Sequence, residues 1–175
     1  DFLLTWHDQI DELNAVDLSD EFREWRNAIV NEGTGYRGVD TESDIDFINN
    51  IFSDVSLEIL GPRYDYGTQG FPWFDDKAHT INGHSVVLGL TYGGVQALFP
   101  GDLNIPGSEH LLADPVLANS MNAHIFKCPH HGSHEFHPPF LEAVRPQISA
   151  ISSGDAPDHG HPRAVLLGAI GNASR

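Results

Sequence analysis

Three short apolar runs in the second half of this chain each end near a side chain that can bind a cation or move a proton. Residues 95–100 run into Gly101-Asp102, residues 124–127 run into Pro129-His130-His131-Gly132, and residues 148–152 precede Gly160-His161-Pro162. Helical patterns lie between the runs, and the order strand, helix, strand, helix predicts a layered α/β fold. Because ligands collect at strand ends in such folds, we expect these polar residues to share one rim of a sheet.

The best-defined local element is a β-hairpin. Residues 85–92 and 95–100 are rich in strand formers and flank Gly93-Gly94, a two-residue glycine turn. Upstream, residues 55–60 alternate apolar and polar side chains and stop at Gly61-Pro62, which predicts a half-buried strand. These runs predict at least three strands before the histidine-rich stretch begins.

Helical patterns fill much of the remaining chain. Phe22, Trp25 and Ile29 recur at helical spacing after a cap at residues 17–21, so residues 1–32 read as helical. A short helix or a turn is expected near residues 47–52. Further helices are expected from Ser108 with a break or restart at Pro115, over 138–144, and from Pro162 to residue 170. We divide the chain into a mainly helical segment, residues 1–54, and an α/β part, residues 55–175, within a single or partial domain.

The composition restricts the partners. The 175 residues carry a net charge of −16 and only two lysines, Lys77 and Lys127, so nucleic acid is a possible but disfavoured partner. Cys128 is alone and no apolar run approaches the roughly 20 residues of a membrane span. The first residues have no basic region typical of a signal peptide, and both ends look cut. We therefore expect no membrane contact and a cytoplasmic location.

Asp102 and the histidine pair are the leading candidates for chemistry. A carboxylate after glycine at a strand end can bridge two cations, although an Asx turn or a helix cap would use the same residues. Imidazole is a common zinc ligand and a general acid or base, so His130 and His131 fit either role. The alternative is one packed and one solvent-facing histidine. Gly132 favours a turn at the two histidines. Since neighbours in an extended loop point opposite ways, we expect at most one to face a given site.

The other histidines carry less weight. His161 is followed by Pro162, which favours an extended backbone and would hold a ligand still. His134 and His137 are expected at the rim as structural residues, and His7 beside Asp8 is expected to be inert. Asn82 and Ser85 are expected to tie a loop to a strand start, with His79 and His84 beside them less clear.

Six segments in order resemble the second half of metallo-β-lactamase-fold hydrolases. They are Asn82-x-x-Ser85-Val86-Val87-Leu88, residues 98–102, Lys127-x-Pro129-His130-His131-Gly132-Ser133, residues 140–146, residues 151–154 and Gly160-His161-Pro162. The resemblance covers residues from about 55 to 172. The most similar type is the hydrolase domain attached to the competence DNA-uptake channel, together with its soluble relatives.

The resemblance implies an αββα sandwich with a site for one or two zinc-like cations at a sheet edge. Asp102 would be the bridging carboxylate and His161 a ligand of one metal, while His130 or His131 would face the scissile group. Metal-bound water would be the nucleophile. The first-half motif of the family, His-x-His-x-Asp-His, is not in this chain. The chain therefore resembles the C-terminal half of such a domain, with the missing N-terminal half of the same protein as its partner.

Two functions follow as hypotheses. The first is a metal-dependent hydrolase that attacks a phosphoester or ester-like bond of a small-molecule or phosphoester substrate. The second is a non-catalytic fragment or binding module that retains part of the fold without a complete metal site. A surface-acidic or adhesive domain is a third reading, but it does not explain why the histidines and Asp102 follow strands.

Overall fold

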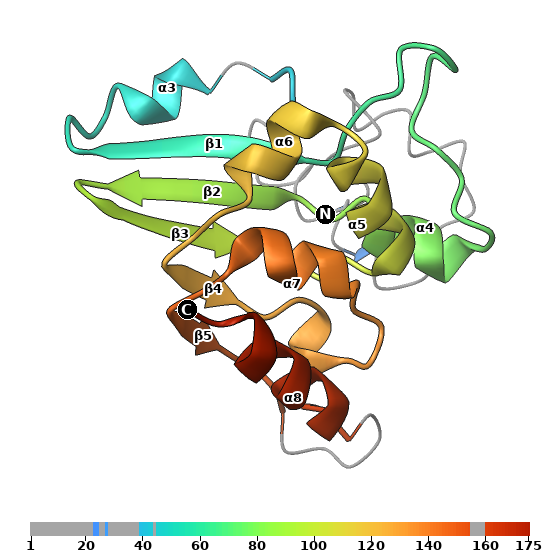
Figure 1. Ribbon diagram of the computed structural model, residues 1–175. Helices are drawn as coiled ribbons and strands as arrows, with labels where there is room; N and C mark the ends of the chain where they lie inside the picture. Colours follow the sequence, from blue (N-terminus) through green and yellow to red (C-terminus); the bar gives the residue numbers. More distant parts are fainter. Residues whose placement is uncertain (1–22, 25–26, 28–38, 44, 155–159) are drawn as a thin grey trace.

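The computed structural model describes residues 23–24, 27, 39–43, 45–154 and 160–175. The predicted helix over residues 1–32, with its cap at residues 17–21, and His7 lie largely or wholly outside these ranges. The described chain is mixed α/β, as predicted, and is built on one five-stranded sheet (Figure 1).

The sheet follows the order of the chain, β1-β2-β3-β4-β5. β1 (Val55–Gly61), β2 (Val87–Tyr92) and β3 (Val95–Phe99) are antiparallel, and the predicted hairpin at Gly93-Gly94 is confirmed between β2 and β3. β4 (Ile125–Lys127) and β5 (Ile148–Ala150) continue the sheet in parallel with β3. The last three strands therefore end at the same edge of the sheet.

Helices provide the crossovers between the parallel strands. α5 (Ile105–Leu112) and α6 (Pro115–Ser120) join β3 to β4, whereas α7 (Pro138–Val144) joins β4 to β5. α8 (Ala164–Ala173) follows β5, and α3 (Asp46–Asn49) precedes β1, where a short helix is expected. Figure 1 shows α6, α7 and α8 on one face of the sheet. Between this face and the helices lies a core that includes Leu60, Val87, Leu98, Phe126, Phe140, Leu141 and Leu166.

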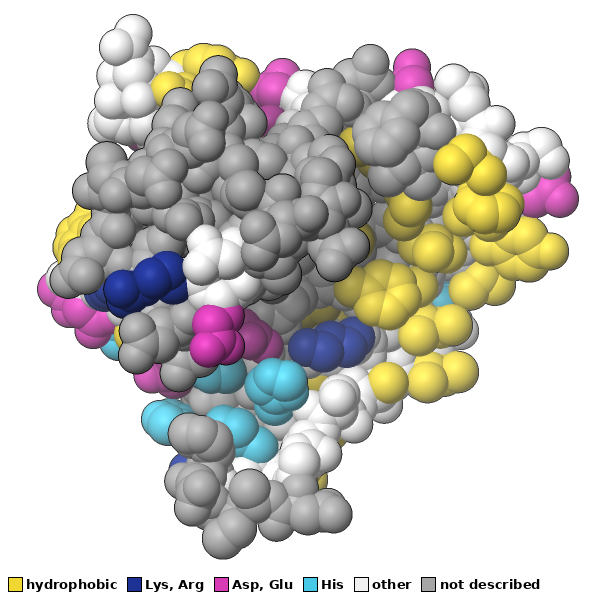
Figure 2. Space-filling view, turned by 180° about the vertical axis from the view of Figure 1, so that it is seen from behind, with side chains coloured by type: hydrophobic (Ala, Val, Ile, Leu, Met, Phe, Trp, Pro, Cys, Tyr) yellow, Lys and Arg dark blue, Asp and Glu magenta, His cyan; other side chains and the backbone are white. Residues whose placement is uncertain are grey.

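The opposite face of the sheet is apolar as well. Leu98 and Phe126 point into the helix-covered core, so their strand neighbours point the other way. One cross-strand row on that face is Leu57, Leu90, Ala97, Ile125 and Ile148. Ile148 is 61% exposed and Tyr92 59%, and Figure 2 shows hydrophobic side chains gathered over this side. We call this surface the open sheet face.

Three local predictions need correction. α4 (Lys77–Gly83) is not predicted, although Asp76 caps it by accepting a hydrogen bond from the backbone N–H of His79. α5 begins at Ile105 instead of Ser108, because the Asn104 side chain accepts from the Gly107 N–H and caps the helix three residues earlier. Pro162 is not the first helical residue, since α8 begins at Ala164. The predicted restart at Pro115 is confirmed at the start of α6.

Within the described ranges, no helix has both the length and the apolar character needed to cross a bilayer.

Candidate functional site

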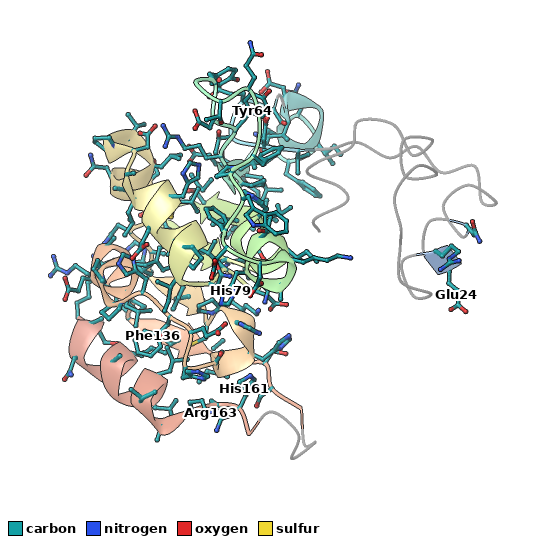
Figure 3. The ribbon with its side chains drawn as sticks, turned by 90° about the vertical axis from the view of Figure 1, so that its right-hand side faces the viewer. Glu24, Tyr64, His79, Phe136, His161 and Arg163 are labelled. Atoms are coloured by element: carbon teal, nitrogen blue, oxygen red, sulfur yellow. The ribbon has the colours of Figure 1, made fainter. Side chains whose placement is uncertain are left out.

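The ends of β3, β4 and β5 bring the candidate residues to one edge of the sheet. Asp102 lies three residues after β3, and His130 lies three residues after β4. His161 follows β5 and precedes α8. Figure 3 views the molecule from this edge and labels His161 below His79, and Figure 2 shows histidine and acidic side chains gathered together. We call this edge the histidine rim.

The two adjacent histidines lie on a tight turn. Residues His130–Gly132 form a 3-10 turn (η2) in which His130 has φ 45° and His131 has φ 51°. The turn expected at Gly132 is therefore confirmed, whereas the extended backbone assumed for the orientation of the two imidazoles is wrong. The backbone N–H of His130 donates to the Gly101 carbonyl at 3.1 Å, which ties the turn to the end of β3. Because of this turn, both imidazoles lie at the rim but have different neighbours.

His131 pairs with Asp102. Its Nε2 lies 3.5 Å from Asp102 Oδ1, and its Nδ1 lies 2.8 Å from the Ser152 carbonyl oxygen. A carbonyl oxygen only accepts, so Nδ1 carries the hydrogen, and in the neutral ring Nε2 presents a lone pair to the carboxylate. Two lone-pair atoms facing each other attract a proton or a cation between them. The Asp102 backbone N–H donates to Ser85 Oγ at 3.0 Å, so Ser85 helps to hold this pair in place.

His130 lies beside His161. Their ring centroids are 5.9 Å apart with an interplanar angle of 65°. The Nδ1 atom of His130 is buried without a hydrogen bond, and Glu135 Oε2 lies 3.9 Å from it. The structure therefore brings the four predicted site residues together as two pairs, Asp102 with His131 and His130 with His161.

The sequence reasoning missed Glu135 and gave His79 no role. His79 Nδ1 lies 2.8 Å from Asp76 Oδ2, and His79 Nε2 lies 3.6 Å from Glu135 Oε1. The hydrogen bond to Asp76, followed by the charge of that carboxylate, raises the pKa of His79. Asp76 before the helix at residues 77–83 was the available signal, because aspartate is a frequent N-cap.

The remaining histidines of this region have structural contacts. His84 is 1% exposed, packs against Phe71 and Phe74, and donates Nε2–H to the Pro72 carbonyl oxygen at 2.8 Å. Burial lowers the pKa of His84, which favours the neutral ring. His137 Nε2 lies 3.8 Å from Glu109, on α5, and His134 is exposed.

A complete metal site is not formed by the part of the chain that the structure describes. No group of three or more His, Cys, Asp and Glu side chains there is arranged to hold an ion. Asp102 Oδ1 and His131 Nε2 have a suitable separation, since two ligands of a tetrahedral zinc at about 2.0–2.1 Å lie about 3.3 Å apart. A structural or catalytic zinc needs at least three protein ligands, so these residues alone do not fit one.

A cavity of about 640 Å³ lies away from the rim. It is lined by residues of the 41–45 segment, β1, the 63–67 loop and the 114–117 segment, and none of the four predicted site residues lines it. The cavity therefore does not bear on the chemistry of the histidine rim.

Comparison with known proteins gives one partial relationship. No protein-family model matches the chain. Over 86 residues, or 49% of the chain, the sequence is 35% identical to competence protein ComA of Neisseria gonorrhoeae, and the match covers 12% of that protein. The chain thus spans only a small part of this relative, and over about half of its own length it is similar to a competence protein.

Proposed function

We propose that this chain is the C-terminal half of a metallo-β-lactamase-type hydrolase domain that, in the intact protein, hydrolyses a phosphoester or ester-like bond. The observation that carries the proposal is the convergence of Asp102, His130, His131 and His161 after three adjacent parallel strands. Strand ends of a parallel sheet are the usual place for catalytic side chains in layered α/β folds.

The open sheet face supports the αββα form of the proposal. A sheet with one face covered by helices and a second apolar face is what one half of a two-sheet sandwich would present. Tyr92, Val95, Phe99 and Ile148 remain 40–61% exposed on this face. A second sheet, from the missing N-terminal half, would bury them.

The contacts of the two imidazoles suggest separate roles. His131 has an oxygen atom beside each ring nitrogen, Ser152 O at 2.8 Å and Asp102 Oδ1 at 3.5 Å, so with a proton or a cation between Nε2 and Oδ1 it would orient the carboxylate. His130 has no such pair of oxygens and lies against His161. As an imidazolium, His130 would give its Nε2 proton to the oxygen that leaves when water attacks the scissile group.

Zinc belongs to the proposal only if residues outside those described add further ligands, because no group of three ligands is present among the described residues. Asp102 and His161 would each contribute one ligand, and the missing half would contribute the others. When bound, the metal would supply an activated water. The net charge of −16 favours a small phosphoester over a long nucleic acid as substrate.

The test uses the intact protein, with every residue that precedes this chain. Bound metal is measured by elemental analysis, and hydrolysis is measured with bis-p-nitrophenyl phosphate. We expect bound zinc and a rate that Asp102→Asn lowers on the order of 100-fold or more. Asp54→Asn is the matched control, because Asp54 is exposed before β1 and its carboxylate accepts a hydrogen bond from the neighbouring Ser53 Oγ at 3.0 Å. A metal-free, inactive intact protein rejects the proposal.

The second candidate is a non-catalytic binding module that keeps the fold without metals. The observation in its favour is the lack of a three-ligand group among the described residues. A ligand that binds only the folded state raises the unfolding temperature. If zinc leaves the unfolding temperature of the intact protein unchanged, the binding module is the better description.

A further inference from the structure

We propose that Glu135 and His79 are positioning residues that fix the orientation and the tautomer of His130. The contacts form a series of alternating carboxylates and imidazoles, Asp76–His79–Glu135–His130, which we call the acid–imidazole array. The inference deepens the proposed function, because it assigns a support to the imidazole proposed to move the proton. Glu135 and His79 themselves would touch neither the substrate nor the reacting atoms.

His79 is held from two sides at the first end of the array. Its Nδ1–H donates to Asp76 Oδ2 at 2.8 Å, and its backbone carbonyl accepts from Asn104 Nδ2 at 2.8 Å. Asn104 is 1% exposed and caps α5, so it is itself rigidly held. With Nδ1 committed to Asp76, only Nε2 of His79 is available to Glu135.

Glu135 connects the two imidazoles. Its Oε1 lies 3.6 Å from His79 Nε2 and its Oε2 lies 3.9 Å from His130 Nδ1. Its backbone N–H donates to Ser133 Oγ at 3.2 Å, which fixes the main chain from which the side chain extends. In a chain with net charge −16, a carboxylate near the rim is stabilised by a neighbouring group that can be protonated, and the His79 imidazole is such a group.

The buried nitrogen of His130 gives Glu135 its role. His130 Nδ1 is shielded from solvent and makes no hydrogen bond, and a buried polar atom in this state costs free energy. In the proposed arrangement, the Glu135 side chain would rotate to close the 3.9 Å gap to hydrogen-bond length. That bond keeps a hydrogen on Nδ1 and leaves Nε2 for the reacting group, as a carboxylate does for a histidine in catalytic and metal sites.

The decisive measurement is the His130 tautomer. In the neutral ring, ¹⁵N NMR of this chain should show the hydrogen on Nδ1. In Glu135→Gln the amide can donate to Nδ1, so the hydrogen should move to Nε2, whereas His79→Ala should give a mixture. Glu142→Gln, an exposed substitution on α7, is the matched control and should leave the tautomer unchanged. An unchanged His130 tautomer in Glu135→Gln overturns the inference.

Kinetics of the intact protein provide a second readout. We expect Glu135→Gln to lower kcat by about 10–100-fold with little change in KM, and Glu135→Asp to recover part of the loss. His79→Ala should add little in the Glu135→Gln background, because both residues act through one contact. If the losses in kcat caused by His79→Ala and Glu135→Gln are additive, the acid–imidazole array is contradicted. If the intact protein has no activity, the proposed function fails, and the NMR result still decides the positioning role.

Discussion

A side chain added at Gly132 would strain the histidine rim. Gly132 has φ +89°, where L side chains are strained, and a Cβ built on it would lie 2.7 Å from Pro162 Cβ and 3.0 Å from Pro162 Cα. The positive φ costs an alanine about 1–2 kcal/mol. Overpacking against Pro162 costs about 1–3 kcal/mol more. We therefore expect Gly132→Ala to lower the free energy of unfolding by about 2–5 kcal/mol.

Urea unfolding of this chain measures the effect. With a slope of about 2 kcal/mol per molar, the midpoint should fall by about 1–2.5 M. Gly168→Ala on α8 is the control, because nothing lies within 4 Å of its added Cβ and alanine stabilises a helix interior by about 0.5–1 kcal/mol relative to glycine. If Gly132→Ala has wild-type stability, the close approach of the histidine turn to Pro162 is contradicted.

Three further substitutions or treatments test other parts of the structure. The carboxylates around His79 raise its pKa, so the stability that His79 contributes is complete below the unfolded pKa near 6.5 and is lost as the pH rises through the folded pKa. In urea titrations, the difference in unfolding free energy between wild type and His79→Asn should therefore decrease with rising pH. A difference that stays constant contradicts the ion pairs of His79. Burial raises the pKa of Cys128 to about 11, so a thiol reagent should label it only after unfolding, and rapid labelling of the folded chain would be inconsistent with its burial. Phe126 is 0% exposed, so Phe126→Ala should lower the free energy of unfolding by about 3–5 kcal/mol in chemical denaturation. Phe99 is 40% exposed, so Phe99→Ala should lower it clearly less. Equal losses would mean that the open sheet face is covered.

The sheet was predictable because its strands carry local signals. Gly93-Gly94 between two β-rich runs predicts the β2–β3 hairpin, and Pro129 and Gly101 mark the ends of two parallel strands. Helical patterns between the later strands predict the crossovers. Together these signals place Asp102, His130, His131 and His161 after strands before any coordinate is known. Their chemical roles stay predictions, as does the division of the chain at residue 54.

The contacts of His79 and Glu135 that support the histidine rim could not be predicted from local sequence signals. α4 has only seven residues, too few for an apolar period, so its cap at Asp76 and the position of His79 carry no periodic signal. Glu135 lies four residues after His131 in an irregular segment, and its contacts with two imidazoles depend on the fold. His130 and His131 have positive φ values in a turn that is tied by the His130 N–H to the Gly101 carbonyl, and no window of sequence reveals a contact between such distant segments.

The carbonyl oxygen of Gly101 accepts two hydrogen bonds, from the His130 backbone N–H and from Lys127 Nζ, each at 3.1 Å. Both lone pairs of one atom are therefore used to join the segments after β3 and β4. Removing the lysine amine would break one link and leave the other. The spacing between the carboxylate and the imidazoles should thus survive surface mutation near β4, and evolution could alter Lys127 without loosening the geometry next to it.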